Sequence, residues 1–339
     1  MSILILIIGI SALILLHELG HFLAAKSYGI RVDEFGFGFP PRLFSIKKGE
    51  TEYSFNLLPF GGFVRLYGEH AAQLEGQKVD QNRSFTHQSA RKRLIVIAAG
   101  VAVNFILGWL ILSASFMIGA SQSVVITQVL EDSPAVEAGL QVGDSLIDFQ
   151  AAESFTQFAN THRGEAIEIN ISREGERQSL VLTPREDESL PAIGVGLTEA
   201  GLAKRGFFQA LWDGLALSVQ AMAQIIQALG RLVADIFGAG KITEGIVGPV
   251  GIFGVASDLG GIGFVYLLQL IGLISLNLAV LNSIPFPALD GGRFLFILIE
   301  KFKGSRLSMK FEMAANATGF ILLLLLMVAI TARDIIQLL

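Results

Sequence analysis

The chain has 339 residues, of which 52% are hydrophobic and only 16% are charged, and its mean hydropathy is +0.59. Soluble domains carry about 25% charged residues, so this composition is too apolar for a water-soluble core alone, and it excludes intrinsic disorder. The absence of cysteine excludes a disulfide scaffold, thiolate zinc sites and a cysteine nucleophile. A net charge of −5 argues against nucleic-acid binding.

Four apolar stretches are long enough to cross a bilayer, which takes about 20 helical residues. A fifth stretch, Phe207–Arg231, repeats polar and apolar residues at steps of three and four, which predicts a two-faced helix. We expect it to lie on the membrane surface, within a connector at 200–258; the alternative is a helix packed on the outer domain. The sequence thus predicts four transmembrane helices, in 1–25, 94–120, 259–289 and 313–335.

The distribution of Lys and Arg predicts the orientation. Residues 26–93 and 290–317 hold 11 and 5 of them, whereas the much longer region 120–258 holds 8. Since basic loops stay in the cytoplasm, we expect 26–93 and the loop 290–312 inside, and region 120–258 and both termini outside. The first stretch lacks the basic start of a signal peptide, so we expect it to be retained.

The first span contains ionisable residues in the pattern His17-Glu18-Leu19-Gly20-His21. On a helix, the two histidines share one face and can reach one metal ion, while Glu18 can reach a water molecule bound to it. Ionisable groups in a span cost about 2.5–3.5 kcal/mol each, so they are functional by default. The alternative is a helix end outside the membrane that carries ordinary polar groups.

A hydrolytic zinc site needs a third protein ligand, and Asp290 is the best candidate. Asp290 is the first charged residue after a long uncharged run. Pro285 and Pro287 before it break the helix, and Gly291 and Gly292 after it let the backbone turn tightly. The alternative role for Asp290 is to cap a helix that begins near Phe294. The remaining histidines lie in polar sequence and are expected at the surface: His70, His87 and His162.

The predicted depths allow the two motifs to meet. His17 lies about 21 Å along the first span, in its cytoplasmic half, and Asp290 lies at the inner end of the third. If Phe207–Arg231 crossed the membrane, Asp290 would reach the opposite face. A shared metal site therefore requires that helix to stay on the surface.

Together, His17–His21 and the run Asn282 to Gly292 (N-x-x-P-x-P-x-L-D-G-G) resemble the site-2 protease family of intramembrane zinc metalloproteases, closest to the bacterial regulator-of-sigma-E protease branch. The runs 100–104 and 248–252 resemble further motifs of that family. The resemblance implies that His17, His21 and Asp290 bind Zn²⁺, that Glu18 is the catalytic carboxylate and that Asn282 holds substrate. Interhelical hydrogen bonding is the alternative role for Asn104, Asn277 and Asn282.

The cytoplasmic connection 26–93 reads as short strands and Gly-centred turns. A protease must unwind its substrate, and a strand edge can capture the extended chain. By resemblance, this segment forms a membrane-associated β-hairpin or sheet, in which Gly61, Gly62 and Phe63 contact substrate. The aromatic residues Phe35, Phe37 and Phe39 suit membrane contact; the alternative is that they pack the sheet.

Region 121–199 alternates short strands with one small helix, which predicts a compact α+β unit. Its run 133–144 (S-P-A-x-x-A-G-L-x-x-G-D) resembles a circularly permuted bacterial PDZ domain. The segment Ile193-Gly194-Val195-Gly196 is the candidate terminal strand and peptide-binding edge. The sequence has room for one such domain.

The predicted fold is therefore a polytopic α-helical membrane protein with four spans, a cytoplasmic-side β-sheet and one outer PDZ domain. The predicted function is zinc-dependent cleavage of single-span membrane proteins, such as anti-sigma factors or signal-peptide remnants, within the lipid bilayer of the bacterial inner membrane. The alternatives are a non-catalytic zinc-binding PDZ scaffold and a divalent-metal transporter. Clustering of the ionisable residues at one depth disfavours transport.

Overall fold

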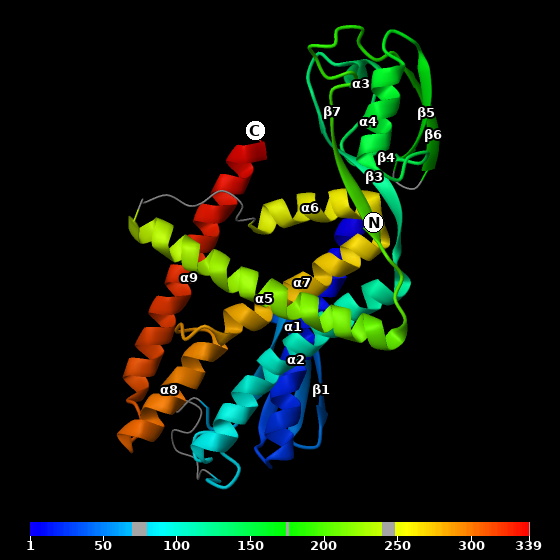
Figure 1. The fold of residues 1–339 in the computed structure, drawn as a ribbon. Coiled ribbons are helices and arrows are strands. Elements are labelled where there is room, and N and C mark those ends of the chain that lie inside the picture. Colours follow the sequence, from blue (N-terminus) through cyan, green and yellow to red (C-terminus); the bar gives the residue numbers. More distant parts are fainter. Residues whose placement is uncertain (70–79, 174–175, 239–247, 339) are drawn as a thin grey trace. The chain divides into compact units, whose positions relative to one another are not determined.

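A computed structural model describes residues 1–69, 80–173, 176–238 and 248–338 (Figure 1). The chain divides into two compact units. The first unit contains residues 1–6, 111–215 and 251–270, and the second contains 7–110, 216–250 and 271–339.

Five helices in the described residues are long and apolar enough to cross a membrane: α1 (Ser2–Ser27), α2 (Ala90–Ile118), α5 (Phe207–Gly238), α7 (Phe264–Ser283) and α9 (Met309–Leu338). Averaged over 18 residues, four of them have a mean hydropathy between 2.2 and 2.5, whereas α5 reaches only 1.2. The fifth candidate is the segment for which the sequence predicts a surface position. Several apolar helices of this length are typical of a polytopic membrane protein.

The third apolar stretch differs from the single span predicted at 259–289. Residues Pro249–Ile262 form a separate helix, α6, and α7 begins only at Phe264. Gly263 between them has φ +158, close to fully extended backbone, and this interrupts the helix. Helix α7 then ends at Ser283, just before Pro285, because proline removes a backbone donor and clashes with the preceding turn.

Small residues bring α1, α2 and α7 together in the second unit. A Cβ added at Gly20 of α1 would lie 2.8 Å from the Ala99 carbonyl oxygen of α2. A Cβ added at Gly9 of α1 would lie 2.8 Å from Ile271 Cδ1 of α7. Such close approach lets dispersion forces and backbone contacts stabilise helix pairs where the hydrophobic effect is weak. The glycines therefore set the spacing of the helices that carry the candidate site.

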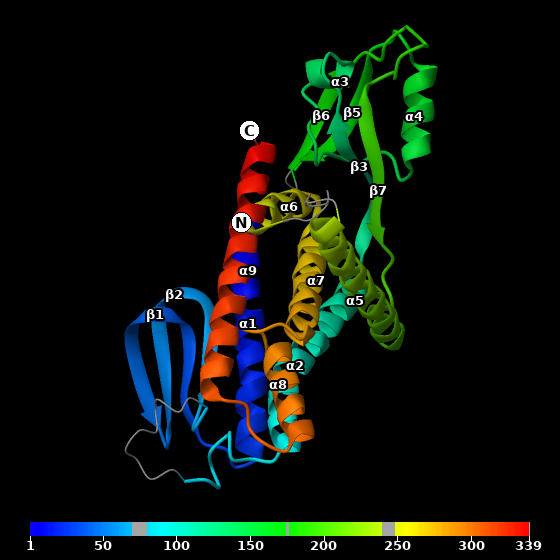
Figure 2. The ribbon, with the colours of Figure 1, turned by 90° about the vertical axis from the view of Figure 1, so that its left-hand side faces the viewer.

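Residues 32–66 form one sheet from two long strands, β1 (Val32–Lys48) and β2 (Thr51–Leu66), rather than several short ones. Residues 34–37 have partners in both 52–55 and 62–65, whereas 62–66 pair only with 32–37. The segment 62–66, called the edge segment below, is thus a free edge among the described residues. Figure 2 shows this sheet beside α1.

The aromatic residues of β1 divide between the two roles considered for them. Phe35 packs edge-on against Phe22 of α1, and Phe37 packs against Phe55. Both residues are half-buried, and the ring of Phe35 stabilises the docking of the sheet on the helix. Phe39 is 49% exposed and remains available for contact with lipid.

The described part of the first unit contains a five-stranded sheet in the order β6-β5-β4-β3-β7. The strands are β3 (Ala120–Val129), β4 (Ser145–Leu146), β5 (Ile167–Arg173), β6 (Glu176–Leu182) and β7 (Val195–Leu202). Two helices, α3 (Pro134–Glu137) and α4 (Ala152–Thr161), pack with this sheet. The core is formed by Ile126, Leu146, Phe155 and Ile169. This is the α+β unit that the alternation of strands predicts.

An ion pair fixes the turn before β4 to the end of β5. Asp144 is 1% exposed, and its carboxylate accepts hydrogen bonds from Arg173 Nε at 2.8 Å and Arg173 Nη2 at 2.7 Å. The guanidinium is planar and matches both oxygens, which is the strong geometry for such a pair. Removing either partner leaves a charge without compensation.

We therefore expect Arg173→Met to destabilise this unit by about 3–5 kcal/mol, because Asp144 would be buried unpaired. Hydrogen–deuterium exchange on the full chain measures the effect as faster exchange in β3 and β5. The matched control is Arg177→Met in β6, an exposed arginine. Equal protection in both variants would contradict the role given to the pair.

Candidate active site

Three ionisable side chains from opposite ends of the chain meet inside the second unit. His17 and His21 lie one turn apart on α1, and both are buried. Asp290 Oδ2 lies 3.0 Å from His17 Nε2 and 3.2 Å from His21 Nε2, and the two Nε2 atoms are 3.2 Å apart. Within the described residues, this is the group of His and acidic side chains whose ligand atoms are close enough to share a metal ion.

A tight loop after α7 carries Asp290 to the histidines. Asp290 is the first residue of α8 (Asp290–Lys303), and the residue at the cap position is Leu289. The alternative that Asp290 caps a helix starting near Phe294 is therefore wrong, since the helix begins four residues earlier. Asp290 instead projects from the first turn, where a helix N-terminus favours a negative charge.

The two glycines after Asp290 are required by the packing of this loop. A Cβ at Gly291 would lie 2.1 Å from the Ile284 carbonyl oxygen, and one at Gly292 would lie 2.3 Å from that of Phe286. No side chain fits at either position, because the loop folds directly onto the first turn of α8. The pair thus sets the position of the carboxylate ligand.

A further contact holds the loop to α9. Ala288 has φ +76, a left-handed conformation that is uncommon outside glycine. Its N–H donates a hydrogen bond to Asn316 Oδ1 at 3.0 Å. Asn316 carries no sequence signal for this role, because its partner is a backbone group that depends on the folded loop.

The surroundings of the histidines leave their Nε2 atoms free to bind a metal. His21 Nδ1 lies 2.9 Å from the Val96 carbonyl oxygen of α2, to which it donates when Nε2 is the unprotonated nitrogen. A Cβ at Gly100 would lie 2.4 Å from His21 Nε2 and 2.8 Å from His17 Cε1. The space beside both rings therefore exists because position 100 is glycine.

Glu18 lies next to His17 on α1 and is half-buried. A Cβ at Gly62 would lie 3.4 Å from Glu18 Cγ, so the edge segment passes beside this carboxylate. Gly61 has φ +106, which bends the chain into the segment, and Phe63 follows it. Of the three predicted substrate-contacting residues, the structure thus places Gly62 beside Glu18, whereas Gly61 lies against Phe39.

The predicted asparagines differ in their surroundings. Asn282 is half-buried in the last turn of α7, and its side chain makes no hydrogen bond within the described residues. Asn277 is exposed. Asn104 is 1% exposed and both of its amide atoms lack a partner, although its carbonyl oxygen accepts from Ser275 Oγ at 2.7 Å. The described residues therefore show no interhelical hydrogen bond from the side chain of any of the three.

The remaining histidines lie apart from this centre in the described part of the chain. His87 is exposed, and His162 is half-buried against Phe158 at the end of α4. His70 lies outside the described residues. Sequence reasoning missed two charged contacts of α8, the ion pair of Arg293 with Glu69 and that of Glu300 with Arg93. The signal available for the first was the position of Arg293, one turn after Asp290.

The candidate peptide-binding edge is shorter than predicted. Strand β7 begins at Val195, whereas Ile193 is buried in the core and Gly194 adopts φ +81 in the turn before the strand. A pocket of about 220 Å³ lies between α4 and residues 191–197. Since β7 pairs only with β3 in the described sheet, its other edge faces this pocket.

The donor set fits a zinc ion. Imidazole nitrogen and carboxylate oxygen are zinc ligands, and ligand atoms that share a tetrahedral ion are about 3.3 Å apart. The observed separations of 3.0–3.2 Å match this arrangement. Three protein ligands would leave the fourth position open, as in catalytic rather than structural zinc sites.

We expect Gly100→Ala to lower the metal content of the purified protein, since its methyl group would occupy the space of the His21 ring. The loss of metal affinity should reach about 10–100-fold, as for other changes that disturb ligand orientation. The control is Gly230→Ala in α5, where an added Cβ meets nothing. Equal metal content in both variants would contradict the steric role of position 100.

Comparison with known proteins shows the family of this chain. The sequence model of peptidase family M50 matches residues 5–326. A protein of Clostridium perfringens whose name describes a zinc metalloprotease is 33% identical over 99% of both chains. The zinc metalloprotease RasP of Bacillus licheniformis and the regulator of sigma-W protease RasP of Bacillus subtilis are each 29% identical, over 97–98% of this chain and 97% of their own lengths. The chain therefore belongs to peptidase family M50 and is a zinc-dependent membrane metalloendopeptidase.

Proposed function

We propose that this protein hydrolyses peptide bonds in or near the transmembrane segment of single-span membrane proteins. The substrate class is that of anti-sigma factors or signal-peptide remnants. The observation that carries the proposal is the meeting of His17, His21 and Asp290 within apolar helices, with Glu18 and a free strand edge beside them. Metal ligands at this depth are expensive to insert, which supports a reaction that takes place in the membrane.

The directions of the helices support four crossings. Gly9 packs against Ile271 near the starts of α1 and α7, whereas His17 meets Asp290 just beyond the end of α7. Helices α1 and α7 thus run in the same direction, and one crossing by α2 between them accounts for this. A further crossing by α5 would reverse α7, so α5 is the surface helix in this proposal.

The density of Lys and Arg sets the proposed orientation in the bacterial inner membrane. The connections 26–93 and 290–317 are the basic ones and lie in the cytoplasm. Both termini and the unit of β3–β7 then lie outside. The metal centre lies toward the cytoplasmic side, where α1 and α7 end.

His17, His21 and Asp290 would hold the zinc ion in the proposed mechanism. When bound, zinc acidifies the attacking water and polarises the peptide carbonyl. Glu18 accepts the proton from this water and returns it to the leaving nitrogen, as a general base and then a general acid. Val96 keeps the His21 ring in place, and the apolar helices limit the access of bulk water.

Substrate enters this mechanism as an extended chain. A peptide bond in a helix has its carbonyl hydrogen-bonded, so the segment must unwind before attack. The edge segment offers unpaired backbone groups beside Glu18, and pairing with them would hold the unwound chain there. Asn282 is the proposed side-chain contact to the substrate backbone, and its lack of an internal partner supports this.

The unit of β3–β7 acts in this proposal as a PDZ domain that filters substrates by their outer chain end. The pocket between α4 and the free edge of β7 supports this role, because strand addition there would bury a terminal side chain. Val195 and Gly196 provide the strand edge.

A non-catalytic scaffold and a metal transporter are the rival functions. A scaffold would need no carboxylate beside the metal, yet Glu18 lies there between the histidines and the edge segment. A transporter would carry polar residues through the full depth of several helices. The family relationship and the clustering of ionisable groups favour the protease.

We expect Glu18→Gln to reduce cleavage of a model single-span substrate by at least about 10²–10⁴-fold, because the amide cannot accept the proton. Zinc content should stay unchanged, whereas Asp290→Ala should lower it. Both are measured on the purified full chain in detergent. Normal cleavage by Glu18→Gln would refute the catalytic role and leave the scaffold as the better function.

We expect Thr156→Trp to weaken binding of a peptide with a free C-terminus by about 30-fold, the loss typical of a central anchoring pocket. Thr156 is an exposed residue of α4 that lines the pocket beside β7. Fluorescence polarisation measures the affinity. Gln157→Trp is the control, since Gln157 is exposed on the same helix but does not line the pocket. Equal affinities would contradict peptide binding in this groove.

A further inference from the structure

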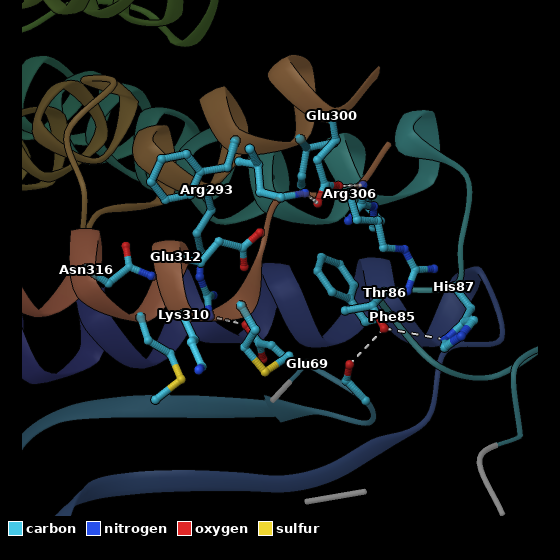
Figure 3. A pocket seen from close by; sticks show the side chains of 17 residues that line it. Glu69, Phe85, Thr86, His87, Arg293, Glu300, Arg306, Lys310, Glu312 and Asn316 are labelled. Atoms are coloured by element: carbon cyan, nitrogen blue, oxygen red, sulfur yellow. Dashed lines mark hydrogen bonds and ion pairs between the residues drawn. The ribbon is translucent and has the colours of Figure 1, made fainter. Parts of the chain in front are cut away.

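A second, larger cavity lies in the unit that holds the metal centre. Its volume is about 1020 Å³, and its walls come from residues 85–87, the start of α2, α8 and the start of α9 (Figure 3). Helices α2 and α9 are candidate spans that both begin here. The ends of spans lie where the bilayer meets water, so this cavity is expected at the membrane surface.

The charged residues of the cavity leave an excess of positive charge at its mouth. Two of its carboxylates are paired inside the wall, Glu300 with Arg93 and Glu69 with Arg293. Glu312 is the third carboxylate in the wall, beside the same arginines (Figure 3).

Two further cations line the cavity without such partners. Arg306 and Lys310 are exposed, and neither forms an ion pair within the described residues. Burial and the positive charge of Arg306 lower the pKa of the neighbouring His87, which favours its neutral form. His87 then offers a hydrogen-bond donor or acceptor rather than a further charge. The mouth is thus suited to an anionic group.

The other side of the cavity is apolar and continues along α9. Met309 and Met313 line it and are exposed. Phe320, Leu324 and Met327 follow on the same face of α9, since the steps are three, four or seven residues, and all are exposed. Only 6% of the most apolar 18-residue stretch of α9 is buried, the smallest share among the candidate spans in the described residues. A ligand in the cavity can therefore extend an apolar chain along this helix toward the membrane interior.

We propose that this cavity binds an anionic phospholipid. Its phosphate contacts Arg306 and Lys310, and an acyl chain follows Met309 and Met313 onto the exposed face of α9. Basic pockets between membrane helices bind lipid headgroups in this manner. The apolar face favours a lipid over a soluble phosphate, which would use only the cations. The two unpaired cations favour it over a transmembrane peptide, whose apolar helix would leave them without a counter-charge.

The test compares lipid binding by the full chain in nanodiscs of phosphatidylcholine and in nanodiscs of equal parts phosphatidylcholine and phosphatidylglycerol. Retention of phosphatidylglycerol after extraction is measured by native mass spectrometry, with competition by phosphatidylcholine giving relative affinity. We expect Arg306→Gln with Lys310→Gln to lower the preference for phosphatidylglycerol by about fivefold per cation. The control removes the same charge from exposed lysines of α8 outside the cavity, Lys301→Gln with Lys303→Gln, and should keep the preference.

A second variant tests the apolar half of the site. Met313→Gln leaves all charges in place and should also weaken retention of phosphatidylglycerol. Equal losses in the cavity and control double variants would assign the preference to general surface charge and overturn the proposal. Full competition by soluble glycerol phosphate would do the same. A third result would also overturn it: in pure phosphatidylcholine, the cavity double variant has a higher KM for a single-span substrate, while its preference for phosphatidylglycerol is unchanged. The cavity would then bind the substrate.

Discussion

The structure depends on placing two imidazoles and a carboxylate together among apolar helices. Each ionisable group costs about 2.5–3.5 kcal/mol to insert at the centre of a span. Their separation of 3.0–3.2 Å lets each compensate the others, and a shared cation satisfies all three at once. The surrounding chain is organised around this requirement, since α1, α2, the loop after α7 and α8 each contribute a group or a space to it.

Much of the centre is made by backbone that approaches closely rather than by added side chains. Gly20 lets α1 and α2 touch, Gly100 leaves room for the His21 ring, and Gly291 admits the loop onto α8. A methyl group at any of these positions would meet an atom at 2.1–2.8 Å. The positions of these three ionisable side chains therefore depend on residues that have no chemical function of their own.

The meeting of His17, His21 and Asp290 was predictable because its signals are local and periodic, whereas their roles as metal ligands stay a prediction. His17 and His21 follow the helical repeat, and the uncharged run before Asp290 marks the depth of the third ligand. The contacts of Asn316 with the Ala288 N–H and of Arg293 with Glu69 were not predictable, because neither pair belongs to a motif whose residue types and spacing point to a shared partner. The break between α6 and α7 was not predicted because it depends on Gly263, one of many glycines in this chain. The short strands predicted in 26–93 form two long strands because some of the predicted turns are only bends within a continuous ladder.

The tertiary environment also determines which aromatic residues of β1 are covered and which are exposed. Phe35 and Phe39 have the same sequence context, alternating with glycine, yet one packs on α1 and the other faces outward. Which face of a strand is covered depends on where the sheet docks, and period-two alternation alone does not contain that information. The position of α5 is also not fixed by its sequence alone. Its two-faced pattern favours the membrane surface, whereas its apolar length favours a crossing.

The 273-residue separation between His17 and Asp290 has a consequence for biosynthesis. Ribosomes release the histidines early, and the carboxylate emerges only when most of the polypeptide has been made. On a nascent chain, the two histidines therefore lack their carboxylate partner until insertion is nearly finished, and this group of three side chains is among the last parts of the fold to assemble.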